Sequence, residues 1–310
     1  MPRPFRFGVS VRRAATRAEW QDKARRAEAQ GYAVFLCPDH LTDVLPPLVP
    51  LVSAADATAT LRVGTFVLNN DLRHPVLVAR DAATIDLLSE GRFELGLGAG
   101  HKEAEYDEIG LRFDASAVRV ERLRESVAIV KRLLAGEEVT FAGAHYRVIE
   151  HRIHPLPMQR PRPPLLIGGN SRRVLTLAGQ EADIVSFLGF SHLRGGRDFD
   201  FGAFTDAGTG ERVATVREAA GARFHELELN AVVQSVVVTS SARRAAEEFA
   251  ADSGLSVDDV LSSPYVLIGS VDAIADKLRE KRERHGFSYW VVQEQSLDAF
   301  APLVSRLSGE

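Results

Sequence analysis

The stretch Tyr32 to His40, YAVFLCPDH, decides the fold. It begins as a run of apolar, strand-forming residues and stops at Pro38. Asp39 and His40 follow the proline, and both side chains can exchange protons. A buried strand that ends in this way presents chemical groups at its carboxyl end. The same pattern, an apolar run followed by polar residues, recurs along the chain.

Eight apolar runs predict eight strands, and helical patterns lie between them. The predicted strands cover residues 5–11, 32–37, 61–68, 92–97, 165–167, 183–187, 229–239 and 289–292. Among the helices, Thr16 and Glu19 form a capping box, and the apolar residues from Val120 to Leu134 recur at helical spacing. Strands alternating with helices predict a parallel sheet, and eight of them favour a closed (β/α)8 TIM barrel.

A barrel of this type takes about 250 residues, so the remaining residues predict insertions after strands four, six and seven of one domain covering residues 1–310. A doubly wound open sheet is the alternative, but no GxGxxG follows the first strand. The stretch from Leu188 to Gly210 is too long for an ordinary connection, and it is either a lid or a disordered loop.

Composition and charge exclude several classes of partner. The 310 residues include 38 Lys and Arg against 42 Asp and Glu, a formal net charge of -4, which gives no basic field for nucleic acid or an anionic membrane. The single cysteine, Cys37, has no disulfide partner, and we expect it to be a small buried apolar residue. No apolar run approaches about 18 residues, and the N-terminus lacks a signal-peptide pattern. We therefore expect a cytoplasmic protein.

In a (β/α)8 barrel the active site lies at the carboxyl ends of the strands, so the residues that follow each apolar run are the site candidates. They are Asp39 and His40 after strand two, Asn69 after strand three, Gly98 and Gly100 after strand four, and Gly168, Gly169, Asn170 and Ser171 after strand five. A histidine in this position can act as general acid or base. A structural loop histidine is the alternative for His40.

The turn from Gly168 to Arg173 suits an anion. Two glycines, Asn170 as a cap and a hydroxyl stand at the start of a helix, with free backbone N–H groups, the positive end of the helix dipole and two arginines nearby. A plain tight turn is the alternative. Gly98 and Gly100 could let a flat ring system approach the backbone.

Other chemistries have less support. The only close histidine pair, His151 and His154, lies beside a proline-rich connector, and we expect no metal site there. No HxH ends the first strand, where Val9, Ser10 and Val11 stand instead. Neither a GxSxG nucleophile elbow nor a Walker loop occurs, so the sequence does not support a hydrolase or a kinase.

Four segments carry a family likeness. They are FLCPDH (35–40), LRVGTFVLNNDLRHPVLVARDAATIDLLSEGRFELGLGAG (61–100), RPPLLIGGNSRRVLTLAGQEADIV (162–185) and IGSVDAIADKLRE (268–280). In this order and spacing they resemble the luciferase-like flavin and deazaflavin oxidoreductases. Within that superfamily, the chain is most similar to the actinobacterial branch that uses the deazaflavin coenzyme F420.

The resemblance implies a TIM-like barrel with the ring system lying across the strand ends. Asp39 and His40 would face the deazaflavin, with His40 as proton donor or stabiliser of the hydride site, and Asn69 would contact the ring. The resemblance also implies a non-prolyl cis peptide bond between Phe66 and Asn69. It further implies a homodimer and a phosphate-binding turn at Gly168, Gly169 and Asn170. An acidic residue after strand four would be Glu103 or Glu105.

We therefore expect an F420-dependent oxidoreductase that exchanges hydride between the deazaflavin C5 and a small organic substrate. A monooxygenase that uses flavin mononucleotide (FMN) and a separate reductase is the nearest alternative, because a deazaflavin cannot form the C4a adduct that activates oxygen. The second alternative is a non-catalytic cofactor-binding protein.

Overall fold

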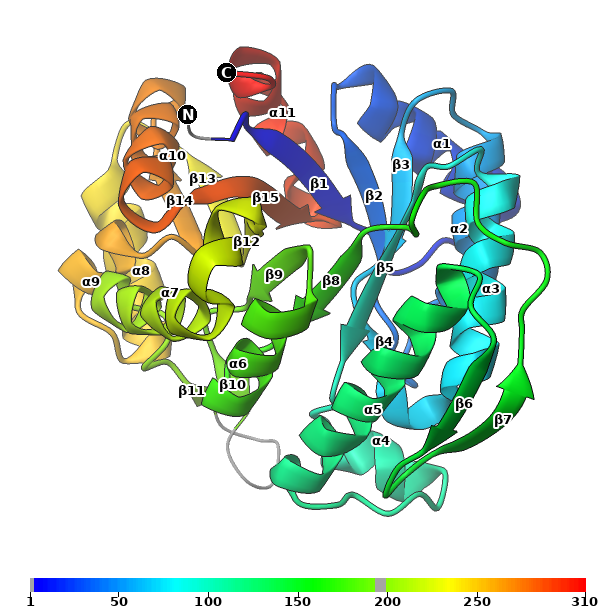
Figure 1. The fold of residues 1–310 in the computed structure, drawn as a ribbon. Helices are drawn as coiled ribbons and strands as arrows, with labels where there is room; N and C mark the ends of the chain where they lie inside the picture. The colour runs from blue at the N-terminus through cyan, green and yellow to red at the C-terminus, as the bar shows by residue number, and fades with distance from the viewer. Residues whose placement is uncertain (1–2, 193–198) are drawn as a thin grey trace.

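The computed structural model describes residues 3–192 and 199–310, and its centre is a closed parallel barrel (Figure 1). The strands follow one another in the order β3-β2-β1-β15-β12-β9-β8-β5-β4, and pairing of β3 with β5 closes the ring. Because β3 and β4 are two pieces of one interrupted strand, the barrel has eight strand positions, which confirms the predicted TIM barrel. The strands are β1 (Arg6–Ser10), β2 (Val34–Cys37), β3 (Arg62–Thr65), β4 (Leu68–Asn69), β5 (Phe93–Gly98), β8 (Leu165–Gly168), β9 (Ile184–Phe187), β12 (Glu228–Val232) and β15 (Phe287–Gln293).

Helices cover the outside of the barrel (Figure 1). They are α1 (Arg17–Ala29), α2 (Leu48–Asp56), α3 (Pro75–Leu88), α5 (Ser116–Leu134), α6 (Arg172–Glu181), α7 (Asp206–Ala220), α10 (Val271–His285) and α11 (Leu297–Leu307). The predicted cap of α1 forms, since the Thr16 hydroxyl accepts the Glu19 N–H at 3.1 Å. The Glu19 carboxylate accepts the N–H of Ala15, one residue before the cap. In the part of the chain that is described, no helix is both long and apolar enough to cross a membrane.

The predicted insertions after strands four, six and seven are present. A hairpin of β6 (Val139–Ala142) and β7 (Arg147–His151) follows α5, and β10 (Ser191–His192) pairs with β11 (Phe199–Asp200). After β12, β13 (Ser235–Val238) pairs with β14 (Val266–Gly269), with α8 (Ala242–Ser253) and α9 (Val257–Ser262) between them.

Two expectations for this half of the chain need correction. Residues 229–239 are not one strand, because β12 ends at Val232 and β13 leaves the barrel to pair with β14. The stretch from Leu188 to Gly210 contains β10, β11 and the start of α7. Its middle, residues 193–198, lies outside the described residues. The lid hypothesis concerns this segment in part.

The stretch Tyr32 to His40 is buried on both faces, as expected for a parallel strand. Val34 and Leu36 point into the barrel, where they pack with Leu166, Ile184, Tyr289 and Val291. Phe35 and Cys37 belong to the larger core between the sheet and the helices. Cys37 is free and fully buried, as predicted, and burial raises the pKa of its thiol to about 12.

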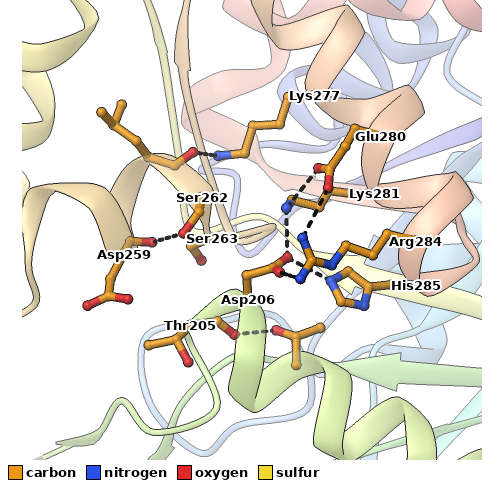
Figure 2. A network of polar contacts seen from close by, with 12 residues as sticks. Thr205, Asp206, Asp259, Ser262, Ser263, Lys277, Glu280, Lys281, Arg284 and His285 are labelled. Atoms are coloured by element: carbon orange, nitrogen blue, oxygen red, sulfur yellow. Dashed lines mark hydrogen bonds and ion pairs between the residues drawn. The ribbon is translucent and has the colours of Figure 1, made fainter.

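Asp206, at the start of α7, joins this helix to α10 (Figure 2). Its Oδ1 lies 2.6 Å from Nζ of Lys281 and 2.7 Å from Nε2 of His285, and its Oδ2 lies 3.0 Å from Arg284. Nζ of Lys277 donates to the carbonyl oxygens of Leu261 and Val266 at 2.6 and 2.7 Å, which ties α10 to α9 and β14. These contacts hold the late insertions against the barrel wall.

An ion cluster fills the N-terminal end of the barrel. Glu94 lies 2.6 Å from Arg6 and 2.7 Å from Arg62, and Arg6 also lies 2.6 Å from Glu228. The Arg6 guanidinium stacks on the Tyr289 ring at 3.9 Å from its centroid. Burial alone would raise the pKa of Glu94, but the two arginines outweigh it and hold the pKa below its usual value.

Removing the buried charge of Glu94 should destabilise the barrel. We expect E94Q to lower the free energy of unfolding by about 3 kcal/mol, because both arginines lose their shared partner. Urea denaturation at pH 7 measures this loss, with exposed E211Q as control. Since the folded-state pKa is depressed, the charged Glu94 stabilises above the unfolded pKa, and the difference between wild type and E94Q should shrink below about pH 4. A loss under about 1 kcal/mol would contradict this.

Candidate active site

The third barrel strand is interrupted between β3 and β4. A cis peptide bond joins Phe66 to Val67, which confirms the predicted non-prolyl cis bond between Phe66 and Asn69. At the interruption the Thr65 hydroxyl donates to the Gly96 carbonyl at 2.9 Å and accepts the Gly96 N–H at 2.8 Å. This side chain therefore replaces backbone pairing between β3 and β5, while Val67 turns toward the barrel interior.

Glycines on the neighbouring strands make room for this interruption. A Cβ atom at position 96 would lie 2.1 Å from the Thr65 carbonyl oxygen, and one at position 98 would lie 2.6 Å from Cγ2 of Val67. At position 168 the distance to Cγ1 of Val67 would be 3.3 Å. The sequence suggested that Gly98 opens the backbone to a flat ring. In the structure, Val67 occupies the space beside Gly98.

Asp39 fixes the end of β2 to the end of β4. Its Oδ2 accepts the backbone N–H of Asn69 at 3.0 Å, and Arg73 donates to both carboxylate oxygens, with Nη2 at 3.1 Å from Oδ1. The carboxylate of Asp39 is buried and occupied by these protein donors. Asp39 therefore positions Asn69 next to His40.

His40 is oriented by Glu105, from the short helix α4 (Glu103–Glu108). Nδ1 of His40 lies 2.9 and 3.2 Å from the two carboxylate oxygens, and Lys102 lies 3.3 Å from the same carboxylate. Glu103 is exposed, so of the two candidate acids Glu105 is the one that contacts His40. With Nδ1–H donating to the carboxylate, the neutral ring presents the lone pair of Nε2.

The electrostatic surroundings keep His40 neutral. Burial lowers the pKa of His40, the Lys102 cation lowers it further, and Glu105 opposes both effects. The ring of His101 packs edge-on against His40 at 5.4 Å between centroids. An oriented, neutral imidazole at a strand end can accept a proton from a bound hydroxyl and return it.

The turn after β8 forms as predicted, with a different cap. Ser171, and not Asn170, caps α6, since its hydroxyl accepts the Val174 N–H at 3.4 Å. The Asn170 amide donates to the carbonyl of Phe190 and accepts the N–H of Leu188 at 3.3 Å, so it holds the following loop. The Gly169 N–H donates to Ser186 at 3.2 Å. Since Ser171 accepts the N–H groups of Val174 and Leu175, the backbone donors at the start of α6 that an anion would use are those of Arg172 and Arg173.

A groove of about 840 Å³ adjoins this turn. Its walls come from α5, the β6–β7 hairpin tip and α6 and are apolar over most of their surface. They are lined by Ala117, Val118, Val120, Glu121, Arg124, His145, Ser171, Arg172, Arg173 and Thr176. The hairpin tip is fixed, because the Glu125 carboxylate accepts the N–H groups of Ala144, His145 and Tyr146 at 2.7, 2.9 and 3.0 Å. Arg124 and Arg172 already contact Glu121 and Glu218 at 3.5 and 3.8 Å. The positive charge offered to an anionic ligand therefore comes mainly from Arg173 and the helix end.

The structure thus brings five of the predicted site residues together at the ends of β2, β4 and β5: Asp39, His40, Asn69, Gly98 and Gly100. Gly168 lies next to the same group, because Val67 is close to both Gly98 and Gly168. The turn between β8 and α6 contains the other three, Gly169, Asn170 and Ser171. Sequence reasoning missed Arg73 and Tyr106, whose partners are 34 and 37 residues away along the chain. Across residues 3–192 and 199–310, no group of three or more His, Cys, Asp or Glu is placed to hold a metal ion.

A closed parallel barrel with an oriented histidine at its strand ends is typical of (β/α)8-barrel enzymes. The family model for luciferase-like monooxygenases matches residues 3–289. The chain belongs to this family.

Comparisons with individual proteins add relatives and shared folds. An F420-dependent glucose-6-phosphate dehydrogenase of Microbacterium testaceum (strain StLB037) is 32% identical over 189 residues, which are 58% of this chain and 55% of that protein. The chain thus spans about half the length of the curated relatives it matches. The coenzyme F420-dependent tetrahydromethanopterin reductase from Methanopyrus kandleri has a TM-score of 0.76 at 17% identity, covering 98% of this chain and 100% of that one. A long-chain alkane monooxygenase has a TM-score of 0.76 at 15% identity, covering 99% and 92%. At these identities both structures show the fold alone.

Changing the two charges beside His40 should shift its pKa in opposite directions. E105Q removes the group that raises the pKa of His40 and should lower it, whereas K102M removes a cation that lowers the pKa and should raise it. An NMR titration of the His40 ring measures both shifts, with R132Q, on the outer face of α5, as control. Shifts of the same sign in the two variants would contradict this electrostatic account.

Proposed function

We propose that the protein is an oxidoreductase that uses coenzyme F420 and exchanges hydride between the deazaflavin C5 and a small organic substrate. The observation that carries the proposal is the pair formed by His40 and Glu105 at the strand ends, at 2.9 Å. Membership of the luciferase-like family and the F420-dependent relatives support the cofactor. The named substrate of those relatives, a sugar phosphate, supports a hydroxyl-bearing substrate.

The chain's own donors fit such a cofactor. The first turn of α6 and the side chains of Arg172 and Arg173 would hold the phosphate. Arg124 and His145 line the same groove as Ser171, and we propose that the groove receives an anionic side chain extending beyond the phosphate. Coenzyme F420 has such an extension and FMN does not. Asn69, at the end of β4, would contact the ring.

When bound, coenzyme F420 supplies the carbon that accepts or donates the hydride. The protein's task is then to place the substrate and to move one proton. In the direction of substrate oxidation, Nε2 of His40 accepts the hydroxyl proton while Glu105 stabilises the imidazolium that forms through Nδ1–H. In the direction of reduction, the same nitrogen returns the proton. Asp39 and Arg73 hold the end of β4 close to the end of β2, where His40 follows.

An FMN-dependent monooxygenase is the second candidate, because the family model that matches the chain describes luciferase-like monooxygenases. The barrel alone does not separate the two, because both chemistries occur on it. Oxygen activation needs the flavin ring nitrogen that a deazaflavin lacks, so the identity of the cofactor decides the reaction. A non-catalytic cofactor-binding protein is the third candidate.

Three broader features also belong to the proposal. Residues 1–310 act as one luciferase-like domain, the protein forms a homodimer, and it works in the cytoplasm. The strand and helix alternation along the whole chain supports the first. Likeness to the family supports the second, and the lone buried cysteine is compatible with a reducing compartment.

Titration with each cofactor tests the proposal. We expect quenching of F420 fluorescence to give a dissociation constant at least about tenfold below that for FMN, because only F420 places charge along the groove. H40A should lower kcat by about 10²- to 10⁴-fold, the usual loss when a general acid or base is removed, with F420 affinity little changed. Exposed H225A is the control.

The other outcomes assign the alternatives. Tighter binding of FMN would replace the proposal with the monooxygenase, and the search would turn to a reductase partner. Tight F420 binding with no hydride transfer to any offered substrate, and an H40A variant changed only in affinity, would favour the non-catalytic protein.

A further inference from the structure

Asn69 is held by hydrogen bonds on its backbone and on its side chain. Its N–H donates to Asp39, and its Oδ1 accepts two hydrogen bonds, from the N–H of Asp71 at 3.1 Å and from the Tyr106 hydroxyl at 3.0 Å. Asn69 is only 8% exposed and Tyr106 only 1%. The amide is therefore fixed inside the site.

These contacts also decide which way the amide faces. A backbone N–H can only donate, so the atom of Asn69 that faces Asp71 has to be the oxygen. The Nδ2 group then points to the opposite side. Among the described residues none accepts a hydrogen bond from Nδ2, and Nδ2 is not one of the buried unpaired atoms. Asn69 thus presents two N–H donors to the open side of the site.

The Tyr106 hydroxyl is itself held in place. Its single proton is shared between two acceptors, Oδ1 of Asn69 at 3.0 Å and Oδ2 of Asp71 at 3.1 Å. Arg122 contacts the same Asp71 oxygen at 2.7 Å. The ring packs edge-on against Phe113 at 4.9 Å. Burial and the Asp71 charge raise the pKa of Tyr106, so the hydroxyl keeps its proton at working pH. A Cβ atom at position 100 would lie 2.0 Å from this hydroxyl oxygen, which explains why a glycine stands there.

Glu105 and Tyr106 are consecutive residues of α4, and each orients one group of the site. Glu105 fixes His40, and Tyr106 fixes Asn69. We propose that Tyr106 is a positioning residue that turns the Asn69 amide so that Nδ2 donates to an acceptor atom, a carbonyl oxygen or ring nitrogen, of the bound ring system. The identity of that ring rests on the proposed function, whereas the orientation of the amide does not.

A double-mutant cycle tests the proposal. Y106F keeps the ring against Phe113 and removes only the hydroxyl, and it should weaken F420 binding about five- to tenfold. N69A should weaken binding by a similar factor. Y106F added to N69A should cost less than about twofold more, because the hydroxyl acts only through the amide. Y32F removes another buried tyrosine hydroxyl, which donates to the Leu297 carbonyl at 2.7 Å, and should leave affinity unchanged.

The side-chain amide resonance of Asn69, assigned by its loss in N69A, gives a readout without any cofactor. In the free protein, Y106F should shift or broaden this resonance, and Y32F should not. An unchanged resonance, or the same fold-loss of affinity in wild-type and N69A backgrounds, overturns the proposal. If the wild type binds neither F420 nor FMN, the proposed function fails, and the amide resonance still decides the role of Tyr106.

Discussion

The site depends on the entry of Val67 into the barrel, where the third strand is interrupted. An interrupted strand leaves backbone groups of its neighbour without their usual hydrogen-bond partners, and its side chains need space inside the barrel. Nearby residues supply both the hydrogen bonds and the space. The Thr65 hydroxyl takes over the hydrogen bonds of Gly96, and glycines at 96 and 98 leave room for the Thr65 carbonyl and Val67. Residues far apart in sequence are therefore fitted to one interruption, and Asn69 emerges from it at a fixed place beside His40.

The charged side chains at the two ends of the barrel have different roles. At the N-terminal end, Arg6, Arg62, Glu94 and Glu228 neutralise one another, and the cluster fills the barrel. At the carboxyl end the buried acids orient other groups, since Asp39 holds Asn69 and Glu105 holds His40. This division matches the general separation of stability and function between the two faces of such barrels.

The sequence predicts the strands well, because an apolar run is a local pattern. Apolar runs followed by polar residues mark β2 and place Asp39 and His40 at its end. Local pattern fails where the deciding contact is distant. The valines after Val232 continue an apolar run, yet β13 pairs with β14 in a separate sheet. Likewise, Gly98 is a glycine because of Val67, 31 positions earlier, and no spacing rule connects the two.

The short helix α4 shows why the sequence left Glu103 and Glu105 as equal candidates and did not indicate Tyr106. Its six residues, EAEYDE, carry no amphipathic repeat and read as a charged loop. Its contribution comes from two adjacent side chains that point to different partners, Glu105 to His40 and Tyr106 to Asn69. One displacement of α4 would disturb both the proton-transfer group and the amide donor at once. In the function proposed above, one short helix would set both the proton acceptor and the ring contact, so α4 would matter to the chemistry as much as the strands do.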